Sequence, residues 1–167
     1  MPQTKERIDS EQNLEGLVCR SITPDLVDYI YNLEQRVYPN GWSRALIESE
    51  FDKVISLRLG LFNRYQLLLG YSFSYLIEDE LHLLNIALDP EYQGQGLGTY
   101  LLSEIISKAS VMGARVSYLE VRRSNQRAIS LYRKFGYVET AYRKAYYQDN
   151  HEDAILMEAD IGRASII

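Results

Sequence analysis

The stretch that decides the fold is DPEYQGQGLGTYLLSEII, residues 89–106. Three glycines at alternate positions (Gly94, Gly96 and Gly98) stand directly before an apolar run whose spacing predicts a helix. A helix N-terminus carries unpaired N–H groups and about half a positive charge, and glycines let an anion approach that backbone closely. The stretch therefore predicts an anion-binding loop between a strand and a helix.

Two familiar nucleotide loops do not match this stretch. The P-loop pattern requires Gly-Lys-Ser/Thr, and Gly98-Thr99 lacks the lysine. The dinucleotide fingerprint needs a further glycine where Thr99 stands. A plain tight turn is the remaining alternative, but such a turn normally needs one glycine rather than three.

Hydrophobic periodicity and turn residues extend the prediction in both directions along the chain. Helices are expected to begin at Thr23-Pro24, Ser43, Leu97 and Ser124-Asn125, and strands are expected at 18–21, 58–62, 66–78, 81–88, 116–121, 137–144 and 154–158. The alternation of strands and helices in the second half implies parallel pairing, whereas the first half supplies antiparallel strands. The prediction is an α/β fold with a mixed sheet.

Length and composition indicate one globular domain. We expect a flexible tail at residues 1–16, the domain at 17–160 and a second tail at 161–167. The N-terminus lacks the apolar core of a signal peptide, and no apolar run reaches the ~20 residues that span a bilayer. A cytoplasmic protein without a membrane partner is expected. Cys19 is the only cysteine and there are two histidines, so we expect neither a disulfide nor a metal site.

The charge is unevenly distributed along the chain. The net charge of −5 argues against a general nucleic-acid binder. Residues 113–144 nevertheless contain eight basic and two acidic side chains, a local charge of +6 that leaves −11 for the rest. This segment is either a solvated basic face or a local site for an anionic ligand.

Four motifs together resemble a known family. Residues 93–98, QGQGLG, match the pattern Q/R-x-x-G-x-G/A, and YLEVRRSNQRAISLYRKFGY follows at 118–137, with Tyr146-Tyr147 and EDAILM at 152–157. From about residue 18 to 160 the chain resembles the GCN5-related N-acetyltransferases, and among them the RimI-type N-terminal acetyltransferases. The resemblance implies a central mixed sheet of six to seven strands with about four helices, and a splay between two central parallel strands.

The same resemblance implies acetyl-CoA as co-substrate, without a metal. The pantetheine arm would lie between strands 81–88 and 116–121. The residues implied to hold acetyl-CoA are Ile86, Ala87 and Leu88 through their backbone, then Gln93, Gly94, Gln95, Gly96, Leu97, Gly98 and Thr99 around the pyrophosphate, and Asn125.

Two residues are implied to carry the chemistry, Glu120 as the base and Tyr132 as the acid. Asn125 and Tyr132 are seven residues apart and share a helix face, which can look toward the strand end that carries Glu120. The alternatives are an outward-facing strand carboxylate for Glu120 and core packing for Tyr132.

The acceptor is the less specific part of the prediction. Trp42, Tyr146 and Tyr147 are implied to contact it, although YPNGWS at 38–43 departs from the Pro-Trp-Ser usual in the family. Neutralising an α-amine at pH 7 costs ~1.4 kcal/mol against ~4.6 kcal/mol for lysine, which favours a protein N-terminus. We expect N-α-acetylation, with ribosomal protein S18 as a candidate, by a monomer or weak homodimer without direct nucleic-acid contact. The alternatives are a small-amine acetyltransferase and a non-catalytic acyl-CoA-binding module.

Overall fold

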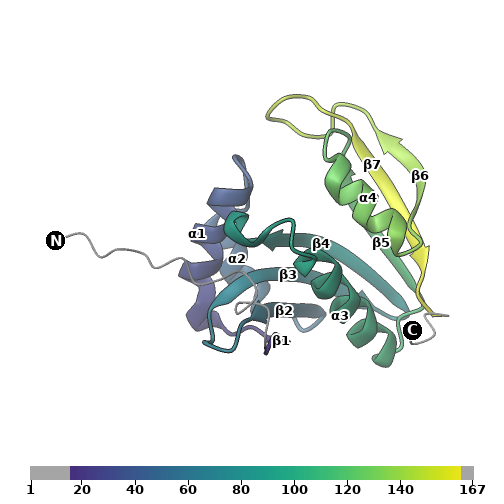
Figure 1. The fold of residues 1–167 in the computed structure, drawn as a ribbon. Helices are drawn as coiled ribbons and strands as arrows, with labels where there is room; N and C mark the ends of the chain where they lie inside the picture. The colour runs from purple at the N-terminus through teal and green to yellow at the C-terminus, as the bar shows by residue number, and fades with distance from the viewer. Residues whose placement is uncertain (1–15, 163–167) are drawn as a thin grey trace.

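The computed structural model describes residues 16–162, which form one seven-stranded sheet with helices on both faces (Figure 1). The elements are β1 (Val18–Ser21), the 3-10 helix η1 (Pro24–Leu26), α1 (Val27–Val37), α2 (Arg44–Glu50), β2 (Ser56–Phe62), β3 (Leu68–Ile77), β4 (Glu80–Leu88), η2 (Pro90–Tyr92), α3 (Leu97–Val111), β5 (Val116–Arg122), α4 (Gln126–Lys134), β6 (Val138–Arg143) and β7 (Ala154–Asp160). Among these residues no helix is long and apolar enough to cross a bilayer.

Side-chain capping explains the starts of α2 and α4. The Ser43 hydroxyl accepts a hydrogen bond from the Leu46 N–H at 3.1 Å, and the Asn125 side chain accepts one from the Ala128 N–H at 3.2 Å. Thr23 is the N-cap residue of η1 and Pro24 is its first helical residue, as predicted, and η1 leads directly into α1. The Thr23 hydroxyl bonds to the Asp25 side chain rather than to a backbone N–H.

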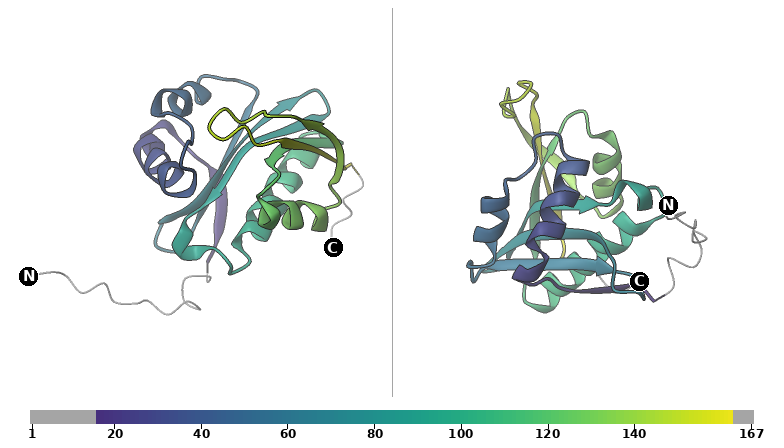
Figure 2. Two further views of the ribbon diagram at one scale, coloured as in Figure 1. Left: turned by 90° about the horizontal axis from the view of Figure 1, so that it is seen from above. Right: turned by 90° about the vertical axis from the view of Figure 1, so that its left-hand side faces the viewer.

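The helices cover both faces of the sheet (Figure 2). Two apolar clusters, one on each face, hold them to it. On one face, Ile30, Leu33 and Ile47 of α1 and α2 pack with aromatic residues of β2 and β3. On the other face, Leu101 of α3 and Ile129 of α4 belong to the larger cluster. The helices of both pairs are amphipathic, so each helix buries its apolar stripe against the sheet and exposes its polar face to solvent.

The strand order is β1-β2-β3-β4-β5-β7-β6, in which β4 and β5 are the one parallel pair. The prediction of parallel pairing throughout the second half is therefore wrong beyond this pair. The reason is the hairpin of β6 and β7, which has no intervening helix and places β7 next to β5 in antiparallel register. β6 runs in the same direction as β5, but β7 lies between them.

The predicted tails at 1–16 and 161–167 fall almost wholly outside the described residues. Ile161, however, is 2% exposed and its N–H donates to the Arg115 carbonyl at 2.7 Å. The Gly162 N–H donates to the same carbonyl at 2.9 Å. The packed domain therefore continues past the predicted boundary at residue 160.

Candidate functional site

The two central strands part in the middle of the sheet. β4 and β5 pair only from Glu80 with Val116 to Leu83 with Leu119. β4 then continues to Leu88 on β3, and β5 continues to Arg122 on β7. Figure 1 shows β5, β6 and β7 turning away from β4 beyond this point. The sheet therefore opens into a gap where β4 and β5 are no longer paired with each other.

Two cavities meet at this gap. The loop cavity, of about 420 Å³, is lined by residues of the loops 38–42 and 147–152 together with β4 and β5. The glycine cavity, of about 700 Å³, is lined by the glycines that precede and begin α3 and by one side of α4. Tyr38, Ile86, Asn125 and Tyr132 line both cavities. A ligand in one cavity can therefore reach a ligand in the other at these four residues.

The glycine cavity is built around the turn that leads from β4 to α3. Gly94 and Gly96 have φ of +79° and +82°, which side chains rarely adopt, and Gly96 is the N-cap of α3. A Cβ at Gly94 would lie 3.1 Å from the Arg127 guanidinium. The Gln93 side chain donates to the Leu88 carbonyl at 3.1 Å, which fixes the turn to the end of β4.

Positive charge gathers on the α4 side of the glycine cavity. Arg127 and Lys134 line it, and Arg127 donates to the Gln93 side-chain oxygen at 3.3 Å. The free N–H groups at the start of α3 add the positive end of a helix dipole. The predicted basic segment thus contributes cations beside the glycine turn, and the glycine cavity suits an anionic ligand.

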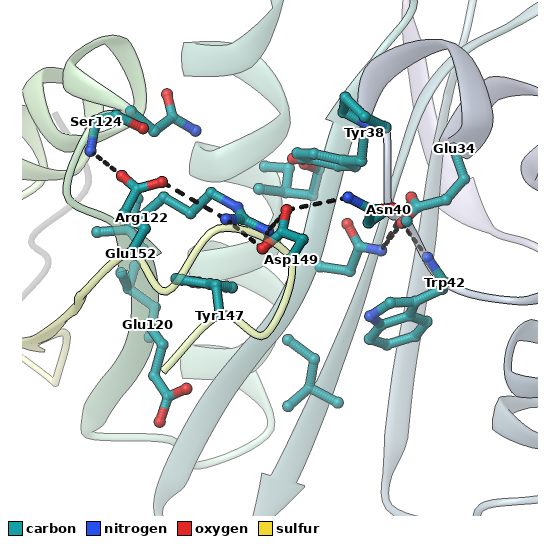
Figure 3. Close-up of a pocket in the computed structure, with 18 of the residues that line it drawn as sticks. Glu34, Tyr38, Asn40, Trp42, Glu120, Arg122, Ser124, Tyr147, Asp149 and Glu152 are labelled. Carbon is teal, nitrogen blue, oxygen red and sulfur yellow. Dashed lines mark hydrogen bonds and ion pairs between the residues drawn. The ribbon is translucent and has the colours of Figure 1, made fainter. Parts of the chain in front are cut away.

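The loop cavity is closed on one side by contacts between distant segments. Asn40 donates to Asp149 at 3.1 Å, and the Arg122 guanidinium forms a two-pronged bond to the same carboxylate at 3.0 and 3.1 Å (Figure 3). Arg122 also lies 3.8 Å from the Tyr147 ring centre and 3.5 Å from Glu152. The hydrogen bonds from Arg122 hold the pKa of Asp149 below its usual value. We call Asn40, Asp149 and Arg122 the loop clasp.

A carboxylate network forms another wall of the loop cavity. Glu34 is 1% exposed and accepts from the Trp42 N–H at 2.8 Å, the Asn85 amide at 3.0 and 3.1 Å, and the Tyr71 hydroxyl. Nearby, the Tyr38 hydroxyl donates to the Ile86 carbonyl at 2.6 Å. Burial raises the pKa of Tyr38 above its ordinary value.

The two residues expected to carry chemistry lie in different surroundings. Tyr132 is 6% exposed and lines both cavities, and its burial raises its pKa well above its ordinary value. Glu120 is exposed, lines the loop cavity and pairs with Arg143 at 2.7 Å. A buried neutral hydroxyl at the junction and an accessible carboxylate in the loop cavity can donate and accept a proton, respectively.

Most of the sequence-predicted residues come together at the gap. Those lining the glycine cavity are Ile86, Ala87, Leu88, Gln93, Gly94, Gly96, Gly98, Thr99 and Asn125. Leu97 lies in the apolar core, 2% exposed, and Gln95 turns its side chain back to the Glu91 carbonyl. Trp42 and Tyr147 line the loop cavity, whereas Tyr146 lies outside its lining and hydrogen-bonds to Glu120.

Sequence reasoning did not single out several residues of the site: Glu34, Tyr38, Asp149, and Arg122 and Arg127 of the predicted basic segment. Glu34 also left a local signal. Glu34 follows Ile30 by four residues and so falls on the apolar stripe of α1, where a charged residue is unusual. Residues 16–162 hold no cluster of histidine, cysteine or acidic side chains arranged for a metal.

Comparison with known proteins identifies the fold family. The model of the Acetyltransferase (GNAT) family matches residues 27–137. The chain belongs to this family. It is 35% identical over 134 residues to the ribosomal protein bS18-alanine N-acetyltransferase of Escherichia coli K12, covering 78% of this chain and 88% of that protein. The ribosomal protein bS18-alanine N-acetyltransferase of Haemophilus influenzae is 33% identical over 132 residues, which cover 77% of this chain and 88% of that protein.

A solved structure agrees with the sequence comparison. The crystal structure of the ribosomal-protein-S18-alanine N-acetyltransferase from E. coli superposes with a TM-score of 0.82 at 34% identity, over 89% of this chain and 96% of that one. The α/β fold with its mixed sheet and four α-helices is thereby confirmed, as is the resemblance to N-acetyltransferases. The protein is an acetyltransferase, and the family uses acetyl-CoA.

Proposed function

We propose that this enzyme transfers an acetyl group from acetyl-CoA to the N-terminal amine of a protein, with ribosomal protein bS18 as the first candidate acceptor. The observation that carries the proposal is the junction of the two cavities at Tyr132 and Ile86. One cavity suits an anionic donor and the other an amine, and the relatives that match most of the chain carry this activity in their names.

The glycine cavity fits coenzyme A. The glycine turn leaves the start of α3 accessible to a pyrophosphate, and a side chain at Gly94 would crowd Arg127. Arg127 and Lys134 are placed to neutralise phosphate charge, and the unpaired edge of β4 from Ile86 to Leu88 can bond to an amide-bearing arm. Acetyl-CoA supplies the thioester whose acyl group is transferred.

Proton movements fall to Glu120 and Tyr132. An N-terminal ammonium must lose a proton before its nitrogen forms a bond to the acyl carbon, and Glu120 takes that proton directly or through water. Once the nitrogen has bonded to the acyl carbon it loses its second proton to water. As the carbon–sulfur bond breaks, Tyr132 donates its proton to the departing sulfur and is reprotonated from solvent. The raised pKa keeps Tyr132 protonated at neutral pH, so the acid is in its active form.

The shape of the loop cavity supports an acceptor that enters end-on. The loop clasp joins two loops across one side of the cavity, and Tyr147 lies against it. Trp42 and Tyr147 supply flat apolar surface for the first residues of a peptide. Carboxylates outnumber cations in the lining, which suits the ammonium group of an acceptor before it is deprotonated.

The same acidic lining favours one second candidate, a small cationic amine such as a polyamine. Acetyl-CoA should therefore be offered with three acceptors: a peptide with the N-terminal residues of bS18, the same peptide with a blocked N-terminus and an added lysine, and spermidine. Mass spectrometry should find acetyl on the first peptide at its α-amine. Turnover of spermidine alone would establish the second candidate, and no product from any acceptor would refute both.

Substitutions connect the activity to the site. Glu120→Gln should lower kcat at least tenfold while acetyl-CoA binding, measured by calorimetry, stays within about twofold of the wild type. Glu139→Gln is the matched control, because Glu139 lies on β6, pairs with Arg133 and lines neither cavity. Equal kcat for Glu120→Gln and the wild type would remove Glu120 from the mechanism.

A further inference from the structure

One buried charge in the site has no part in the chemistry described so far. Glu34 projects from α1 and is 1% exposed. Its neighbours on the same helix face, Ile30 and Leu33, are packed in the apolar core. A buried carboxylate is unfavourable unless several donors satisfy it, so its surroundings show what it holds.

The donors around Glu34 come from three other segments. Oε1 accepts from the Trp42 backbone N–H at 2.8 Å and from the Asn85 amide at 3.1 Å. Oε2 accepts from the same amide at 3.0 Å and from the Tyr71 hydroxyl. Asn85 and Tyr71 belong to β4 and β3 in the middle of the sheet, whereas Trp42 belongs to the loop between α1 and α2. Glu34 therefore ties that loop to the sheet (Figure 3).

The loop also approaches Glu34 with its backbone at Gly41. A Cβ at Gly41 would lie 2.7 Å from Glu34 Cγ and 2.8 Å from Oε1, closer than real Cβ atoms come. Gly41 does not have a positive φ, so its backbone conformation suits any residue. The need for glycine at this position therefore comes from the space that Glu34 occupies. This accounts for the glycine of the Asn40-Gly41 pair that departs from the family pattern.

The segment held in this way, residues 38–42, supplies one whole side of the loop cavity. It carries the Tyr38 hydroxyl that bonds to Ile86, the Asn40 amide of the loop clasp and the Trp42 ring. The Trp42 ring packs on Phe73 of β3, with ring centres 5.5 Å apart. A shift of this segment would move all three groups together, because they follow one another along the chain.

We propose that Glu34 is a positioning residue that holds residues 38–42 in the conformation that receives the acceptor. The inference rests on the proposed function for the identity of the acceptor, but not for the contact itself. Glu34 touches no reacting atom in this role. It acts through the Trp42 N–H and through the close approach of Gly41, and its effect is expected on acceptor binding rather than on acetyl-CoA.

The single tryptophan of the chain makes the contact directly measurable, since all tryptophan fluorescence comes from Trp42. Glu34→Gln replaces one acceptor oxygen by an amide N–H₂, which leaves at least one of the surrounding donors without a partner. We expect the Trp42 emission to shift to longer wavelength and acrylamide quenching to rise about twofold. Glu50→Gln is the control, because Glu50 is equally buried, at 1%, but lines neither cavity.

Kinetics separate positioning from a general loss of stability. With the accepted peptide, Glu34→Gln should raise the acceptor KM about tenfold, the loss expected for one buried hydrogen bond to a charged group. The KM for acetyl-CoA should change less than about twofold. Glu50→Gln should leave the acceptor KM at the wild-type value once both proteins are measured well below their melting temperatures.

A double-mutant cycle tests the steric part of the proposal. Gly41→Ala alone should disturb Trp42 emission, whereas adding it to Glu34→Ala should have little further effect, because the clashing side chain is gone. If Glu34→Ala does not fold, Glu34→Gln and Gly41→Ala decide the question separately.

Two results would overturn the inference: wild-type emission and acceptor KM in Glu34→Gln, or equal changes in Glu50→Gln. Since emission needs no acceptor, failure of the proposed function would leave this test intact.

Discussion

Replacing Tyr132 by phenylalanine separates its chemical role from its packing. The ring stays, so the buried contacts of a side chain that is 6% exposed are kept and only the hydroxyl is lost. We expect the free energy of unfolding to change by less than about 1 kcal/mol. Positioned general acids contribute roughly 10²–10⁴ in rate, about 3–5.5 kcal/mol of transition-state stabilisation. The variant should therefore lose kcat by two or more orders of magnitude.

Tyr137 provides the matched control within the same core. Its ring centre lies 5.7 Å from that of Tyr132, and its hydroxyl and the Ser117 hydroxyl form a 2.6 Å hydrogen bond with both residues buried. Tyr137 lines neither cavity. Tyr137→Phe leaves the Ser117 hydroxyl without this partner, which should cost roughly 1–3 kcal/mol of stability. Its kcat should stay within about threefold of the wild type.

Two measurements distinguish the variants: thermal unfolding reports stability, and single-turnover mixing with acetyl-CoA and acceptor reports the rate of the chemical step. Tyr132→Phe should keep its Tm and lose rate, whereas Tyr137→Phe should lose several degrees of Tm and keep its rate. If Tyr132→Phe retains more than a third of the single-turnover rate, its hydroxyl is not the acid. Equal rate losses in both variants would indicate a packing effect.

Three further predictions concern the donor, the acceptor and pH. Gly94 has φ +79° and its added Cβ would lie 3.1 Å from Arg127, so Gly94→Ala should weaken CoA binding about tenfold by calorimetry. Gly113→Ala is the control, because Gly113 has φ +104° in open space; this change should lower Tm and leave CoA binding unchanged. Asp149→Ala, which breaks the loop clasp, should raise the acceptor KM and leave the acetyl-CoA KM unchanged; a change in both would argue against the acceptor role. Burial raises the pKa of Tyr137 and Tyr147 to about 12, so the unfolded chain loses these protons first, near pH ~10. The contribution of these two tyrosines to stability should therefore be constant below that pH and be lost as pH rises toward 12, and Tyr137→Phe should make the fall in Tm measurably shallower.

The helices, most strands and the glycine turn could be predicted from local patterns. Periodicity, caps and turn residues depend on neighbours a few positions away, so the chain itself specifies them. Gly94 and Gly96 indicated a turn before a helix, and Glu120 and Tyr132 lay within a motif that could be compared with a family. The order of strands was less accessible, because the insertion of β7 beside β5 depends on the β6–β7 hairpin packing into the sheet rather than on any local signal.

The loop cavity was decided by the tertiary structure. Asn40 and Asp149 are 109 residues apart in the chain and meet only because the splay of β5 brings the 147–152 loop over the end of α1. Glu34 lies on the apolar stripe of α1, and the groups that satisfy its carboxylate come from Trp42, Asn85 and Tyr71 in three other segments. By itself the sequence determined the glycine turn and the helices and strands around it. The loop cavity required the fold, because its contacts join residues that no short-range pattern connects.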